Sequence, residues 1–178
     1  MELLNKTKCY LTGHMQYQNG ESWRNIVKER LGKLGVTSFD PYHKPFINSF
    51  EENDGTRAKL LNQMENEEYD VVTKYMKQVR CEDLRLCDIS DFIFCRISPS
   101  IASWGTAEEI FWSNRMKKPI FLVVEGGKKK CPLWLMGVIP HKYIYDTIED
   151  ALVMLEKIHI GEKEINSDRW HLLKDNYR

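Results

Sequence analysis

The sequence has no excess of either charge and no long apolar run. Lysine plus arginine and aspartate plus glutamate each number 26 among 178 residues, so the formal net charge is zero. Proteins dedicated to nucleic acids usually carry a basic excess, and we therefore expect no nucleic-acid partner. The one basic cluster, Lys128-Lys129-Lys130, follows two glycines and is interpreted as a solvated loop tip.

Paired metal ligands and paired cysteines are also missing. The five cysteines are an odd number, and no two of them have the CxxC spacing. Two lie inside apolar runs, which favours reduced, mostly buried thiols in a cytosolic protein. The five histidines show no pairing at ligand spacing, so we expect neither zinc nor any other metal, and no cofactor.

Targeting signals are absent as well. Residues 1–8 are polar and lack the apolar centre of a signal peptide, and no apolar run approaches the length of a membrane-spanning helix. We therefore expect a cytoplasmic protein with no membrane partner. The length fits one domain over residues 1–160, and Trp170 in the tail 161–178 predicts that the tail docks on that domain.

Apolar periodicity predicts alternating strands and helices. Strands are expected at 9–12, 36–39, 92–97 and 120–124, with an edge strand at 143–145. Helices are expected at 23–34, 60–79, 83–87, around Glu109, and at 147–158 with Thr147 as the N-cap. This alternation predicts an α/β fold: a single-domain, three-layer, Rossmann-like (flavodoxin-like) sandwich with a mainly parallel five-stranded sheet.

The segment from Ser103 to Ile110 is the most informative stretch of the chain. It follows the apolar strand 92–97 and predicts a tight loop with one glycine, then a helix whose first turn carries Glu108 and Glu109. A strand that ends at a helix N-terminus forms a corner that binds anions or ligands. A carboxylate facing a sugar in such a corner is a candidate nucleophile, and the helix dipole is expected to lower its pKa.

Three motifs together resemble the nucleoside 2-deoxyribosyltransferase family, including its relatives that hydrolyse nucleoside 5′-monophosphates. They are Tyr10-Leu11-Thr12-Gly13, the Asp83-Leu84 pair followed by Asp91, and the Gly105-x-x-x-Glu109 corner. The similarity runs from about residue 8 to residue 159. Each motif alone is weak, and the specificity of the resemblance rests on their combined spacing.

The resemblance implies a double displacement at the anomeric carbon. Glu109 attacks, the base leaves, and another base or water resolves the glycosyl-enzyme. Asp83 is implied to bind the base and to supply its proton, and Tyr10 to hold the Glu109 carboxylate. Alternatives from the residues alone stay open: Glu108 is the rival nucleophile, Asp83 is an ordinary helix-start residue, and Tyr10 is a core residue.

The substrate-binding residues implied by the resemblance are Gly13, His14, Ser103, Gly105, Thr106 and Trp134. The transferases usually have an aspartate where this chain has Ser103, whereas the monophosphate hydrolases have a serine, and this favours a nucleotide substrate. His14 either contacts phosphate or is a plain turn residue. Trp134 either stacks on a base or packs at a subunit interface, and Trp104 either lines the pocket or joins the core.

The expected function is therefore cleavage or transfer of the N-glycosidic bond of 2′-deoxynucleosides or their 5′-monophosphates. The family resemblance implies a homodimer or larger homo-oligomer, with a small-molecule nucleoside or nucleotide as the substrate. The segment from Pro41 to Thr56, with four aromatic or histidine side chains, is expected to be either a lid or a plain surface loop. The rival function is a non-catalytic nucleotide-binding sensor or scaffold of the same fold.

Overall fold

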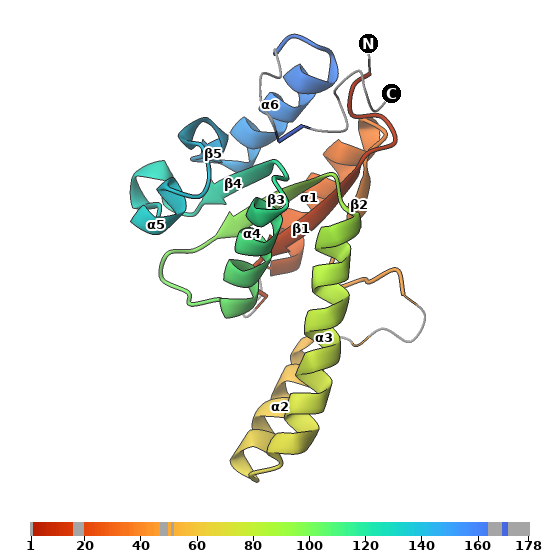
Figure 1. Cartoon of the computed structure of the whole chain (residues 1–178), viewed down its shortest axis with the longest axis vertical. Helices are drawn as coiled ribbons and strands as arrows, with labels where there is room; N and C mark the ends of the chain where they lie inside the picture. Colours follow the sequence, from red (N-terminus) through yellow and green to blue (C-terminus); the bar gives the residue numbers. More distant parts are fainter. Residues whose placement is uncertain (1, 16–19, 47–49, 51, 164–168, 171–178) are drawn as a thin grey trace.

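Five strands form one sheet in the order β2-β1-β3-β4-β5, and every pairing is parallel (Figure 1). The computed structural model describes residues 2–15, 20–46, 50, 52–163 and 169–170. The strands are β1 (Lys8–Gly13), β2 (Thr37–Phe39), β3 (Phe92–Ile97), β4 (Ile120–Val124) and β5 (Ile144–Tyr145). The predicted α/β, flavodoxin-like fold is confirmed.

Helices cover both faces of the sheet (Figure 1). Helices α1 and α6 pack together on one face, and α3 and α4 pack together on the other. The α-helices are α1 (Gly20–Lys33), α2 (Asp54–Glu65), α3 (Tyr69–Ile89), α4 (Trp104–Arg115), α5 (Leu133–Met136) and α6 (Ile148–His159), and two short 3-10 helices are η1 (Lys128–Lys130) and η2 (His141–Tyr143). Thr147 caps α6 as predicted, because its hydroxyl accepts the Asp150 N–H at 3.1 Å.

The core lies in and around the three central strands. Every residue of β4 and the first four residues of β3 are buried, as continuous apolar runs in a sheet covered on both sides require. The ring of Trp170 lies with its centroid 5.8 Å from those of Phe92 and Phe121, and the side chain is only 1% exposed. The start of the tail therefore contributes to the core.

The predicted break between the helices before β3 is wrong. One helix was expected over 60–79 and a short one over 83–87, whereas α3 continues unbroken from Tyr69 to Ile89. The break lies earlier, where Asn66 caps α2 and Glu67 takes a positive φ of 61°. Asp83 consequently lies in the C-terminal third of a long helix and does not begin a helix.

The start of α4 also differs from the prediction. The helix begins at Trp104, so Gly105 is its second residue and is not part of a loop. A Cβ at Gly105 would meet no atom within 4 Å, so the packing of this chain does not require glycine there. The first turn of α4 has no acidic residue, and Glu108 and Glu109 lie in the following turn.

Helices α2 and α3 form a hairpin that projects away from the sheet (Figure 1). No residue of α2 is buried, and the buried residues of α3 all lie from Val79 onward, in the half of the helix that packs on the sheet. Asn53, which was assigned to a loop, caps α2 by accepting the Thr56 N–H at 2.9 Å. Within the described residues, no helix combines the length and apolar character needed to cross a membrane.

Replacing Trp170 with alanine should lower the free energy of unfolding by about 3–5 kcal/mol, because it leaves a cavity between two core aromatic rings. Urea unfolding followed by circular dichroism measures the change. The matched control is Trp104→Ala, since the side chain of Trp104 is 86% exposed; its effect should stay within about 0.5 kcal/mol. Equal effects of the two substitutions would contradict a docked Trp170.

Candidate active site

The side chain of Glu109 points inward from α4 to the end of β1. Tyr10 donates its hydroxyl to Glu109 Oε1 at 2.8 Å, and Thr12 donates its hydroxyl to Oε2. Tyr10 and Thr12 are two residues apart on one strand and therefore face the same side of the sheet. A hydrogen bond to each carboxylate oxygen therefore fixes the orientation of the Glu109 side chain, and Glu109 is only 8% exposed.

The environment of Glu109 shifts its pKa in the direction opposite to the one predicted. Burial raises the pKa of Glu109 to about 7, against the lowering effect of the Thr12 and Tyr10 hydrogen bonds. The helix dipole was expected to lower this pKa, but its influence falls off within the first turn, and Glu109 lies beyond that turn. Desolvation is the larger effect here.

Glu108 faces away from this centre. Its carboxylate receives two hydrogen bonds from Arg80 Nε, at 2.9 and 2.8 Å, and a further one from the same guanidinium group. Consecutive helix residues differ by about 100° around the axis, so only one of the two acids faces inward. The structure therefore places Glu109, and not Glu108, beside Tyr10.

Asp83 lies in a cluster of acids around one lysine. Lys44 Nζ lies 3.0 Å from Asp83 Oδ1, 2.8 Å from Glu52 Oε1 and 3.5 Å from Glu82 Oε2. Burial, followed by the charges of Glu52 and Glu109, raises the pKa of Asp83 to about 8, against the lowering effect of Lys44. A pKa raised in this direction favours the protonated form of Asp83 at neutral pH.

The turn after β1 is held by close packing and by a buried cation. A Cβ at Gly13 would overlap the carbonyl oxygen of Arg96 on β3, so only glycine fits. Arg24 donates from Nη2 to the Gly13 carbonyl at 2.9 Å, and its Nε lies 3.7 Å from Asp40 Oδ1. These contacts fix the backbone that precedes His14.

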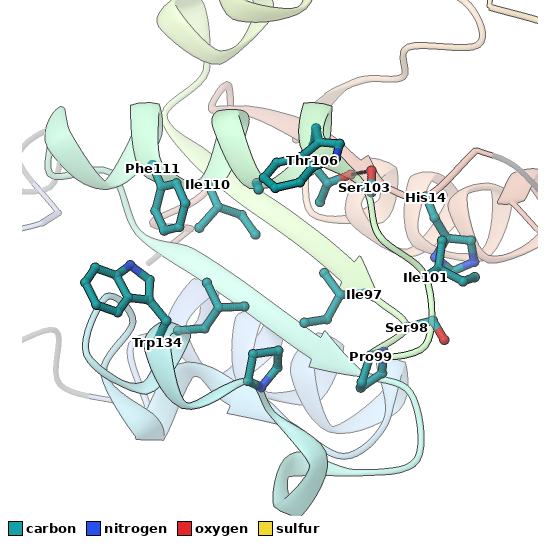
Figure 2. Close-up of a pocket in the computed structure, with 14 residues that line it drawn as sticks. His14, Ile97, Ser98, Pro99, Ile101, Ser103, Thr106, Ile110, Phe111 and Trp134 are labelled. Atoms are coloured by element: carbon teal, nitrogen blue, oxygen red, sulfur yellow. Dashed lines mark hydrogen bonds between the residues drawn. The ribbon is translucent and has the colours of Figure 1, made fainter.

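His14, Ser103 and Thr106 lie together at the N-terminus of α4, beside a cavity of about 320 Å³ (Figure 2). Ser103 donates its hydroxyl to Thr106 Oγ1 at 2.8 Å. His14 is buried, burial lowers its pKa, and its Nδ1 has no hydrogen-bond partner within the described residues. The rest of the lining is mainly apolar and includes Phe111 and Trp134, which project toward the cavity from α4 and α5 (Figure 2).

A second cavity, of about 660 Å³, lies between the α2–α3 hairpin and α4. Glu52 from the acid cluster and Tyr75 from α3 line it. Trp104 lines both cavities and is 86% exposed, so the alternative that Trp104 joins the core is wrong. Glu109 lines neither cavity. Thr106, one turn earlier on α4, lines the first cavity, and Glu52, whose charge raises the pKa of Glu109, lines the second.

Sequence reasoning missed three residues that contact the predicted catalytic residues or act on them through their charge: Thr12, Lys44 and Glu52. Thr12 has a signal in the sequence, because it follows Tyr10 at the two-residue period of a strand. Lys44 and Glu52 have none, since both come from the connection between β2 and α2 and meet α3 only in the fold. Part of the predicted lid, residues 47–49 and 51, lies outside the described residues.

Several contacts hold the described part of the connection between β2 and α2 in place. Tyr42 donates its hydroxyl to the Met15 carbonyl at 3.1 Å, and Phe50 packs edge-on against Tyr75 with ring centroids 4.9 Å apart. The Phe50 N–H donates to both oxygens of the Glu82 carboxylate, at 3.3 and 3.1 Å. The segment therefore lies against the site, and its aromatic residues anchor it there.

Replacing Glu109 with glutamine should stabilise the fold increasingly as the pH rises. Glu109 has an ordinary pKa of 4.5, and its pKa in the fold is about 7, so the folded state holds a proton that the unfolded state has lost between these values. Its contribution to stability falls across that window in the wild type and not in Glu109→Gln. Thermal melting at pH 4 and pH 8 measures this; an equal difference in Tm at both pH values would contradict the raised pKa.

No protein-family model matches the chain, and no curated protein sequence matches it. Among solved structures, a 2-deoxyribosyltransferase from the psychrotolerant bacterium Bacillus psychrosaccharolyticus matches with a TM-score of 0.52 and 19% identity, over 75% of this chain and 82% of that chain. The Clostridium botulinum CMP N-glycosidase BcmB matches with a TM-score of 0.46 and 16% identity, over 84% and 98% of the two chains. The first match shows that this chain shares the fold of a 2-deoxyribosyltransferase.

Proposed function

We propose that the protein is an enzyme of the nucleoside 2-deoxyribosyltransferase family that breaks the N-glycosidic bond of 2′-deoxynucleosides or their 5′-monophosphates. The observation that carries the proposal is the inward-facing Glu109, held by Tyr10 and Thr12 at the carboxyl end of β1. Ligands of parallel α/β sheets bind at that end of the strands. The shared fold with a 2-deoxyribosyltransferase supports it.

Glu109 is the proposed nucleophile. Its carboxylate oxygen forms a bond to C1′ as the C1′–N bond breaks, and the electron pair of that bond goes to the departing base. Tyr10 and Thr12 keep the carboxylate in one orientation, which reduces the entropy lost on reaching the transition state. The product of this step is a glycosyl ester of Glu109.

Asp83 is the proposed general acid. A nucleobase is a poor leaving group unless it is protonated, and Asp83 carries a proton at neutral pH because of its raised pKa. It gives this proton to the base as the base leaves. Water or a second base then attacks C1′, Asp83 takes up the proton of that nucleophile, and the Glu109 carboxylate is released.

The N-terminus of α4 is the proposed site for the 5′ end of the substrate. His14, Ser103 and Thr106 present polar side chains there, and the helix N-terminus attracts anions. Ser103 supplies a hydroxyl where a carboxylate would repel phosphate, and this favours hydrolysis of a 5′-monophosphate. Gly13 holds the turn that places His14, and Gly105 leaves space on the first turn of α4.

Exposed aromatic and apolar side chains on α5 support the proposed homo-oligomer. Leu133 and Trp134 are both largely exposed, and Trp134 stands at the edge of the smaller cavity (Figure 2). Apolar side chains of this size on a surface are typical of protein–protein contacts. In this proposal Trp134 packs against a neighbouring subunit close to the substrate.

Mixing the protein with deoxynucleosides and their 5′-monophosphates should release free base, detected by chromatography. Mass spectrometry of the same mixtures should show a sugar adduct on the peptide that contains Glu109. Glu109→Ala should lower base release by at least about a thousandfold and abolish the adduct, because it removes the nucleophile. Binding of substrate without base release by the wild type would favour the non-catalytic sensor.

The matched control is Glu108→Gln, which changes the neighbouring acid on the same helix. Glu108 pairs with Arg80 on the outer side of the helix, so this substitution should leave the rate of base release within about twofold. If Glu108→Gln lowered the rate of base release as much as Glu109→Ala does, the assignment of Glu109 as the nucleophile would be wrong.

The pH dependence of kcat/KM should be bell-shaped. The pKa of Glu109 is about 7 and that of Asp83 about 8, so the rate should rise as Glu109 ionises and fall as Asp83 loses its proton. Initial rates from pH 5 to pH 10 measure both limbs. Asp83→Asn should lower the rate at every pH and remove the alkaline limb; a limb that persists in this variant belongs to another group.

A further inference from the structure

Lys44 is a buried cation supplied by the connection between β2 and α2. Its side chain is only 1% exposed, and its ammonium group contacts Glu52, Glu82 and Asp83 within 3.5 Å. Removing a charge from water is unfavourable unless opposite charges compensate for it. The carboxylates of Glu52 and Glu82 supply that compensation, and the Asp83 carboxyl group lies 3.0 Å away on the same ammonium group.

Three carboxyl groups lie within 3.5 Å of the ammonium group of Lys44. Because the side chain is buried among them, we expect Lys44 to act on the reaction through these neighbours and not by contact with a substrate. Among these neighbours, Asp83 is the residue to which the proposed function gives a chemical role.

The connection that carries Lys44 is fixed on both sides of it. On one side, Lys28 Nζ pairs with Asp40 Oδ2 at 2.7 Å. On the other, the Phe50 N–H donates to Glu82 on α3. The position of Lys44 is therefore set by contacts independent of Asp83, as a group that positions another must be.

We propose that Lys44 is a positioning residue, which holds Oδ1 of Asp83 so that Oδ2 faces the base of the substrate. The proposal rests on the proposed function. Lys44 Nζ lies 3.0 Å from Oδ1, and a protonated carboxyl group with a cation beside one oxygen presents its proton from the other. In this arrangement the connection between β2 and α2 aligns the general acid.

The charges around Asp83 determine what removal of Lys44 does to the pH profile. Asp83 faces Lys44 and Glu52 from the connection, Glu82 and Cys87 on its own helix, Glu109 from α4 and Tyr10 from β1. Lys44 lowers the pKa of Asp83, whereas burial and the charges of Glu52 and Glu109 raise it. Loss of Lys44 therefore raises this pKa further, and Asp83 keeps its proton to a higher pH.

The experiment compares Lys44→Gln with the wild type in the full chain, using base release from the best substrate of the panel. We expect the alkaline limb of the pH profile to move up by about one pH unit or more. We expect kcat to fall about ten- to a hundredfold, with a smaller change in KM, because the acid is no longer aligned. Lys44→Arg keeps the charge and should return the limb to its wild-type position.

The matched control is Lys28→Gln, which removes the other lysine ion pair of the connection without changing the charge beside Asp83. It should leave the alkaline limb in place. The proposal is wrong if the alkaline limb of the pH profile does not move in Lys44→Gln. It is also wrong if this limb moves by the same amount in Lys28→Gln.

Circular dichroism and thermal melting show whether Lys44→Gln folds. If it does not, Glu52→Gln replaces it as the test: Glu52 raises the pKa of Asp83, so its loss should move the limb to lower pH. An unmoved limb there overturns the proposal. Failure of the wild type to release any base overturns the proposed function, and the role of Lys44 falls with it.

Discussion

The contact between Glu109 and the hydroxyls of Tyr10 and Thr12 sets the geometry of the whole site. It joins α4 to β1, the neighbour of the central strand β3, through a buried carboxylate, which must be hydrogen-bonded to be tolerated in the interior. This contact selects which face of α4 turns toward the sheet, and it leaves Glu108 on the outer side with Arg80. Every other functional assignment depends on that rotation of the helix.

Charge is distributed unevenly between the site and the rest of the molecule. The chain as a whole is neutral, yet Glu52, Glu82 and Asp83 gather around the ammonium group of Lys44, and the charge of Glu109 also acts on Asp83. An excess of buried acid over buried base is relieved when some of the acids keep their protons. In the proposed mechanism, Asp83 is the carboxyl group that donates a proton and Glu109 is the one that ionises, within the same pH range.

The sequence was sufficient where one interaction decides the outcome. Continuous apolar runs located β3 and β4, and the family resemblance singled out Glu109 over Glu108, which is the acid that faces Tyr10. The break between α2 and α3 was missed because it has no glycine or proline and depends on Glu67 adopting a positive φ. The raised pKa of Glu109 and the arrival of Lys44 at Asp83 arise from tertiary burial, which local spacing does not encode.

Helix α3 joins the sheet domain to the projecting α2–α3 hairpin. Its exposed half lines the larger cavity together with α2, and its packed half carries Asp83. A helix of this length extends roughly 30 Å, so the projecting end of the hairpin and Asp83 belong to one continuous helix. In the proposed mechanism, whatever binds the far end of the hairpin therefore contacts the same helix that carries the general acid.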